Sequence, residues 1–134
     1  MGVRELVTTR LTTDPTLIAD GINLESTFLN HDKDTPQVRP LMVLRWQATS
    51  PGLSTVNQRN LQVWVHDVPG DYTRIDRILK RVRIVLESIV GVNAGDATSW
   101  ITQIDWKGDS DDLDDDEAVT FCRNSNFTVT GSAV

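Results

Sequence analysis

One stretch of this sequence constrains the fold more than any other, because its apolar residues recur at a regular helical spacing. Residues 71–90 read DYTRIDRILKRVRIVLESIV, with apolar side chains every three or four positions, which places them on one stripe of a helix. Asp71 can accept hydrogen bonds from free N–H groups of the first turn, and Gly91 suits a left-handed C-terminal cap. We therefore predict a long helix whose stripe must be buried, formed by Ile75, Ile78, Leu79, Val82, Val85, Leu86, Ile89 and Val90.

The outer face of this predicted helix is basic, although the chain has a formal net charge of −6. Its carboxylates are Asp76 and Glu87, and they are outnumbered by the cations Arg74, Arg77, Lys80, Arg81 and Arg83. Such a face is usually solvated, and this is the simpler interpretation. The excess of positive charge also makes four of these residues a candidate subunit interface, namely Arg74, Arg77, Lys80 and Arg81.

The negative charge of the chain is concentrated in residues 109–117. The acidic residues there are Asp109, Asp111, Asp112, Asp114, Asp115, Asp116 and Glu117, with no base between them. The rest of the chain holds 12 acidic and 13 basic residues and is nearly neutral. This balance argues against a surface that wraps nucleic acid, which would need a clear basic excess.

The spacing of this acidic run does not match a calcium-binding loop. Such a loop needs oxygen ligands at alternating positions, a glycine at the sixth position and a glutamate at the twelfth. Counted from Asp109, Leu113 takes the fifth position and Asp114 the sixth. Three interpretations stay open: a solvated loop extended by charge repulsion, an electrostatic role, and a divalent-cation site. We favour the solvated loop and predict no metal site.

Length and composition predict one domain, covering residues 1–134. A chain of this length can bury about two thirds of its unfolded surface around one core. Apolar residues make up 39% of it, and no apolar run approaches the roughly 20 residues of a membrane span. Because the N-terminus lacks the apolar centre of a signal peptide, we expect cytosolic synthesis. Cys122 is alone, which excludes an internal disulfide and predicts a small buried side chain.

The remaining patterns predict an α+β fold. Two short helices are expected at residues 3–11 and 15–20, the second starting at Asp14-Pro15. Alternating apolar residues predict strands at 41–49, 60–66, 99–106 and 118–130, with a bulge at 124–126 and a short extended piece at 27–29. We therefore predict a four-stranded, mainly antiparallel sheet with the long helix packed across one face and short N-terminal helices.

The sequence contains no motif that indicates catalysis. His31 and His66 stand in no zinc or nucleophile motif, and the sequence has no glycine-rich phosphate loop and no GxSxG turn. We predict no catalytic residue, no cofactor and no enzymatic activity.

Several strings of the chain, taken in order, resemble the tail-terminator (tail-completion) family of long-tailed, siphovirus-type bacteriophages. These small proteins close the head-proximal end of the tail tube. The resemblance covers nearly the whole chain and is carried by the strings VRELVTTRL, RPLMVLRWQ, NLQVWVHD, DYTRIDRILKRVRIVLESI and EAVTFCRNSNFTV. The segment at residues 23–37 and the dense acidic run at 109–117 depart from the family's pattern.

The resemblance implies a structural virion protein in the neck region of the phage tail, present in the host cytoplasm during assembly. Six copies would form a ring that contacts the tail-tube protein, stops tube polymerisation and joins the head-completion or connector protein. The implied partners include no membrane and no sequence-specific nucleic acid, because genomic DNA only passes through the ring. Ring subunits need two unlike patches that meet head to tail. The basic helix face and the acidic run are candidates, and we expect the acidic run near the channel or on a ring face, where it would repel passing DNA.

Other interpretations stay open. Another neck component, such as a head–tail connector, or a tail-tube subunit would share the ring assembly at a different level of the particle. A small metal-dependent nuclease would use the acidic run, which however lacks a defined ligand pattern. A generic acidic adaptor domain is the remaining alternative.

Overall fold

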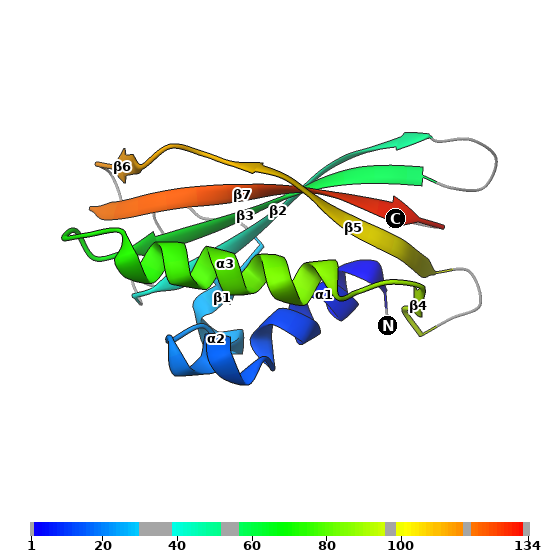
Figure 1. Cartoon of the computed structure of the whole chain (residues 1–134), viewed down its shortest axis with the longest axis horizontal. Helices are drawn as coiled ribbons and strands as arrows, with labels where there is room; N and C mark the ends of the chain where they lie inside the picture. The colour runs from blue at the N-terminus through cyan, green and yellow to red at the C-terminus, as the bar shows by residue number, and fades with distance from the viewer. Residues whose placement is uncertain (1, 30–38, 52–56, 96–98, 117–118, 133–134) are drawn as a thin grey trace.

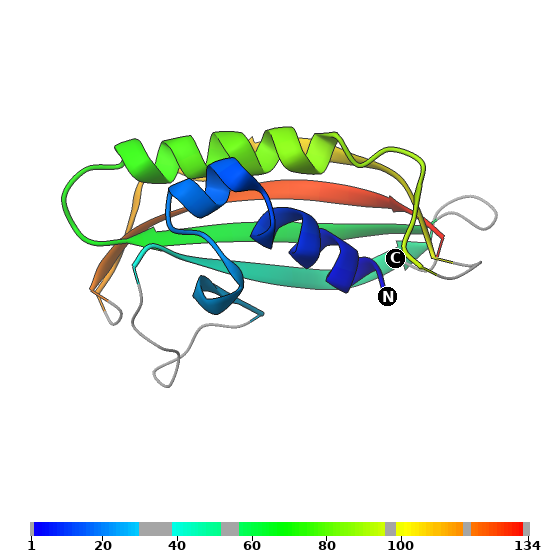
Figure 2. The ribbon, with the colours of Figure 1, turned by 90° about the horizontal axis from the view of Figure 1, so that it is seen from below.

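The structure, a computed structural model of the whole chain, describes residues 2–29, 39–51, 57–95, 99–116 and 119–132. Its helices include α1 (Val3–Thr12), α2 (Pro15–Ala19) and α3 (Thr73–Glu87), and a 3₁₀ turn, η1, spans Leu24–Ser26. Figures 1 and 2 show α1, α2 and α3 together on one face of a twisted sheet, whose other face these helices leave uncovered. The described part of the chain therefore has a helical layer and a sheet layer.

Within the described residues, seven strands form one sheet in the order β1-β2-β3-β7-β5-β4, and β6 also pairs with β7. β1 lies parallel to β2, whereas the other neighbouring strands are antiparallel. The strands are β1 (Thr27–Phe28), β2 (Leu41–Pro51), β3 (Asn57–Asp67), β4 (Val92–Asn93), β5 (Trp100–Asp109), β6 (Leu113–Asp115) and β7 (Thr120–Gly131).

The predicted fold class, a four-stranded sheet with a long helix, is wrong. The described sheet has seven strands, and α3 has 15 residues and ends at Glu87, short of the predicted end at residue 90. The four predicted strands correspond to β2, β3, β5 and β7, and the predicted extended piece at 27–29 corresponds to β1. β4 and β6 were not predicted, because segments of two or three residues are too short to show an alternation of their own.

Helix α3 packs on β3, β5 and β7 and buries much of the predicted apolar stripe. Its buried residues are Ile75, Ile78, Leu79, Val82 and Leu86. As predicted, Asp71 accepts a hydrogen bond at the start of the helix, from the Thr73 N–H at 2.9 Å. Gly91 does have a positive φ of 62°, but it lies beyond the helix end at Glu87 and donates its N–H to the Thr102 carbonyl of β5.

The core lies between the helices and the covered face of the sheet. The sheet contributes Leu44, Val63 and Phe127, which are fully buried, and α1 contributes Val7 and Leu11. Burial of each such side chain contributes roughly 1.5–3 kcal/mol relative to exposure. At the end of β7, a Cβ on Gly131 would lie 2.0 Å from the Trp100 carbonyl oxygen, so only glycine lets β7 pass β5 this closely.

The predicted bulge at residues 124–126 is wrong, because β7 pairs with β3 there without a break. Irregular pairing occurs instead in β2, between Trp46 and Thr49, and in β5, between Trp106 and Gly108. One of the turn-forming residues that suggested the bulge, Asn124, instead forms hydrogen bonds with Ser110. The Ser110 N–H donates to the Asn124 carbonyl at 2.8 Å, and the Ser110 hydroxyl accepts from the Asn124 N–H at 3.0 Å.

The N-terminal helices begin where the sequence predicts. Asp14 caps α2 by accepting a hydrogen bond from the Leu17 N–H at 3.1 Å, and Pro15 occupies the first turn. In the described part of the chain, none of the helices is long and apolar enough to cross a membrane.

Replacing Leu79 or Val82 by aspartate is expected to prevent folding. Leu79 is 2% exposed and Val82 is fully buried, so either change places an unpaired carboxylate in the core. The expected cost, on the order of 3–5 kcal/mol, is comparable to the whole stability of many domains. Thermal melts followed by circular dichroism measure this, with Lys80→Asp on the exposed side of the same helix as the control. A cooperative, native-like melt for Leu79→Asp would show that α3 is not central to the fold.

Candidate assembly surfaces

The basic residues of α3 are largely paired within the chain. Arg74 binds Asp67 at the end of β3 through two hydrogen bonds, one of them from Nε at 2.6 Å. Arg77 binds Asp20 with a shortest distance of 2.7 Å. Arg81 binds Asp14 through Nη2 at 2.8 Å and Nε at 3.0 Å. These pairs tie α3 to α2 and to β3.

Among the predicted interface residues, Lys80 alone has no ion-pair partner within the described residues, and it is exposed. Arg83, which lies next to them, pairs with Glu87 at 2.6 Å and also stacks over the Trp106 ring at 4.0 Å from its centroid. The helix face therefore offers less free positive charge than the sequence suggests. Its role as a subunit interface stays a prediction.

The acidic run is partly incorporated in the sheet and partly outside it, with residues 110–112 and 116 lying between or beyond the strands. Asp109 is the last residue of β5, and Leu113–Asp115 form β6, which pairs with β7. Glu117 lies outside the described residues. We call the described portion, residues 109–116, the acidic segment. Its placement near a channel or on a ring face stays a prediction.

One cation, Arg123 of β7, anchors the acidic segment. Its guanidinium donates to the Ser110 carbonyl at 3.1 and 3.2 Å and lies 3.5 Å from Asp112 and 3.7 Å from Asp109. Arg123 also binds Asp76 of α3, so the segment is held against the helix. The sequence did carry a signal for this residue, because Arg123 shares strand parity with Phe121 and Phe127, and an inward-facing arginine requires acidic or carbonyl partners.

Tyr72 gives the acidic segment a second anchor. Its hydroxyl donates to the Leu113 carbonyl at 2.7 Å, and its ring stacks on Phe121 at a centroid distance of 4.8 Å. Burial, followed by the nearby carboxylates of Asp112 and Asp114, raises the pKa of the Tyr72 hydroxyl. The segment thus projects negative potential onto its surroundings.

Several carboxylates of the acidic segment remain exposed. Asp111, Asp114 and Asp116 have no ion-pair partner within the described ranges. Arg123 therefore compensates only part of the charge. The edge of the sheet at β5 and β6 keeps a strong negative field.

The opposite edge of the sheet, at β2, carries positive charge. Arg4 of α1 and Arg59 of β3 both lie over the Trp46 ring, at 6.0 and 5.4 Å from its centroid. Arg59 also donates to the Gln47 carbonyl at 2.6 Å. Burial and the nearby Arg4 guanidinium lower the pKa of Arg59. Arg45 of β2 is exposed and has no ion-pair partner among the described residues.

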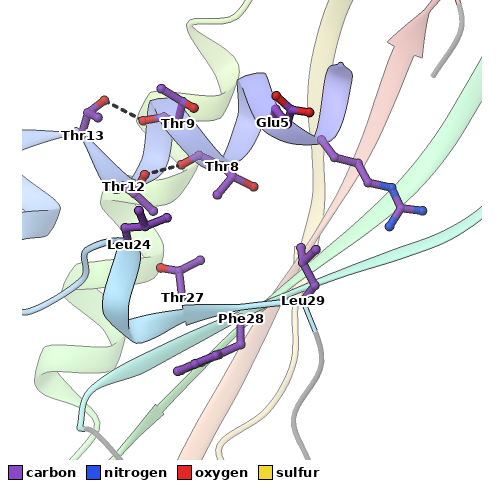
Figure 3. Close-up of a pocket in the computed structure, with 10 residues that line it drawn as sticks. Glu5, Thr8, Thr9, Thr12, Thr13, Leu24, Thr27, Phe28 and Leu29 are labelled. Carbon is purple, nitrogen blue, oxygen red and sulfur yellow. Dashed lines mark hydrogen bonds between the residues drawn. The ribbon is translucent and has the colours of Figure 1, made fainter. Parts of the chain in front are cut away.

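An apolar groove with a volume of about 600 Å³ lies beside this edge, between α1 and β1 (Figure 3). Leu24 and Leu29 line it and are 70% and 55% exposed. On the α1 side, the hydroxyls of Thr12 and Thr13 donate to carbonyl oxygens one turn earlier, at 2.8 and 2.6 Å. These hydroxyls are satisfied within the helix, so the groove offers mainly apolar contact.

Among the described residues, His66 and Cys122 form no recognisable active site. His66 is buried, with Nδ1 2.9 Å from the Thr120 hydroxyl and 4.0 Å from the Asp115 carboxylate, whereas His31 lies outside the described residues. Cys122 is buried as predicted, and burial, followed by Asp115 and Asp114, raises the pKa of its thiol to about 11. In the part of the chain that the structure describes, no three potential metal ligands are grouped around a common point.

Comparison with known proteins does not assign this chain to a family. No family model matches it, and a search of the curated proteins finds no match.

Replacing Arg81 by alanine is expected to destabilise the protein by roughly 1–3 kcal/mol at pH 7, because the buried Asp14 carboxylate loses its cation. The hydrogen bond from Arg81 lowers the pKa of Asp14, so the pair stabilises the fold above the ordinary aspartate pKa. That stabilisation is lost as the pH falls through the lowered pKa. The stability difference between variant and parent should therefore shrink below about pH 4.

Urea unfolding at neutral and acid pH measures this difference. Lys80→Ala, which removes an exposed cation without a partner, is the control and should change the free energy of unfolding by less than about 0.5 kcal/mol. An equal loss for Arg81→Ala at both pH values would mean that the arginine acts through packing alone.

Proposed function

We propose that this protein is a structural virion protein, the tail terminator of a long-tailed bacteriophage. Six copies form a closed ring on the head-proximal end of the tail tube and stop its polymerisation. The other face of the ring binds the head-completion or connector protein. The subunit assembles in the host cytoplasm, remains in the neck of the virion and catalyses no reaction.

The observation that carries this proposal is that the sheet ends in two unlike and largely open edges. Among the described residues, β1 pairs with β2 only at Met42 and Val43, and β4 pairs with β5 only at Trp100 and Ile101. Within the described ranges, most of β2 and β5 therefore has no strand partner on one side. A subunit with two unlike surfaces can join copies of itself head to tail, and such contacts close into a ring when the rotation permits.

The strings that resemble the tail-terminator family fall on the elements that build this fold. VRELVTTRL lies in α1, RPLMVLRWQ leads into β2, and NLQVWVHD lies in β3. The remaining strings contain α3 and most of β7. The resemblance therefore involves the helical layer and the central strands together, which supports an equivalent fold and role.

The acidic segment suits a protein through which DNA passes. Its exposed carboxylates would repel a phosphate backbone, whereas a basic lining would hold DNA through counterion release. Screening limits this effect to about 8–10 Å at physiological salt. In the proposed ring the segment therefore lies near the channel or on the ring face, close to the path of the DNA.

A cryo-electron microscopic reconstruction of a phage particle that carries this protein tests the proposal. We expect six copies in one ring between the tail tube and the head, with residues 109–117 close to the channel. A neck without this protein, or a ring with another number of copies, would contradict the terminator assignment. A ring of six with the acidic segment on its outer wall would contradict only the electrostatic part.

A further inference from the structure

We propose that the open edge of β2 in one copy binds the open edge of β5 in the next copy, so that the sheet continues from subunit to subunit. The contact sets Arg45 against Asp105 of the neighbouring copy, and the acidic segment lies beyond Arg45, level with residues 41–44 of β2. This inference rests on the proposed ring and names the surfaces through which the ring closes.

The direction of the strands allows this contact without turning one copy around. β2, β3, β7 and β5 are each antiparallel to the next strand in the sheet, so β5 runs antiparallel to β2. A copy related by rotation about an axis nearly parallel to the strands presents its β5 antiparallel to β2. The alternation then continues across the contact, and the parts of β2 and β5 that have no strand partner within the described residues gain one.

Charged residues on the two edges lie at similar heights along the strands. Followed through β3 and β7, cross-strand pairing aligns Arg45 of β2 with Gly108 of β5. Followed through β7, it aligns Asp105 of β5 with Asn60 of β3. The β3 partner of Arg45 is Gln62, two residues from Asn60. Paired residues share a face of the sheet, and so do alternate residues of one strand. Arg45 and Asp105 therefore lie on the same face, and their heights along the strands differ by two residues.

The two edges differ in the sign of their net charge, although β5 also carries the exposed Lys107 and Asp105 accepts a hydrogen bond from Gln103 at 2.9 Å. On the β2 edge, Arg45 lacks an ion-pair partner within the described residues, and Arg4 and Arg59 crowd the same tryptophan ring. On the β5 side, the exposed carboxylates of the acidic segment outnumber Arg123, the cation that binds them in the described part of the chain. Complementary potentials of this kind steer association and fix the register of the partners.

Apolar surface lies next to both edges and adds to the contact. Arg4 belongs both to the rim of the α1–β1 groove and to the Trp46 stack, so the groove with Leu24 and Leu29 is continuous with the β2 edge. On the other edge, Trp100 at the start of β5 is 45% exposed. Burial of these side chains supplies association energy that exposed ion pairs alone do not provide.

Irregular pairing on both strands makes the contact selective. The ladders are interrupted between Trp46 and Thr49 in β2 and between Trp106 and Gly108 in β5. Interrupted edges pair poorly with arbitrary strands, which protects a protein from aggregation. Complementary charge and shape then decide which strand is accepted.

Cysteine cross-linking tests the contact directly. In a Cys122→Ala background, the double variant Arg45→Cys, Asp105→Cys is treated with a bismaleimide about 10 Å long. This length tolerates a register shift of two residues, which moves a side chain by about 7 Å. We expect covalent multimers that end at six chains. Their rate of formation should fall between 0.05 and 0.5 M salt, because the double variant keeps Arg4, Arg59 and the acidic segment, whose charges steer the encounter.

The matched control is Lys80→Cys, Asp111→Cys, which joins the basic face of α3 to the acidic segment. Multimers from this control and none from Arg45→Cys, Asp105→Cys would overturn the edge contact and leave the ring proposal standing. Multimers from the edge pair that continue past six would support the contact but contradict a hexameric ring. Failure of the edge pair to form multimers at any salt concentration would also overturn the contact.

Discussion

The packing of α3 on one face of the sheet is the contact on which the rest of this structure depends. It buries Ile75, Ile78, Leu79, Val82 and Leu86 against β3, β5 and β7, and α1 closes the same core. Because the helices and the sheet bury their apolar faces against each other, a partner must bind one of the other surfaces. The remaining surfaces are the outer side of α3, the uncovered face of the sheet, and the two open edges.

Ion pairs within the chain further reduce the surfaces that are available to a partner. Arg74, Arg77 and Arg81 of α3 use their charges to hold Asp67, Asp20 and Asp14, so they fix α2 and the end of β3 against the helix. Arg123 does the same for the acidic segment. The charge left over is separated across the sheet, positive beside β2 and negative beside β5 and β6. This separation favours contacts between copies at the edges over contacts through the helix face.

The sequence predicts those parts of the fold that have their own periodicity. α3, β2, β3, β5 and β7 are long enough for helical or alternating patterns to appear, and Asp14 and Pro15 mark the start of α2. β4 and β6 depend on neighbouring strands and leave no pattern, which is why the predicted sheet was too small. Ion pairs between segments that are far apart in the sequence also leave no local pattern, so the sequence does not predict them. The sequence suggests a free basic face on the helix, although three of its arginines find partners at residues 14, 20 and 67.

We propose that the edges of the sheet, and not the basic face of α3, join the copies of this protein. The most direct measurement is a reconstruction of the assembled ring at a resolution that separates strands. We expect β2 of one copy to lie about 4.8 Å from β5 of the next, the spacing of hydrogen-bonded strands, with Arg45 near Asp105. A ring in which Lys80 and its neighbours on α3 form the contact, while both sheet edges face solvent, would contradict it.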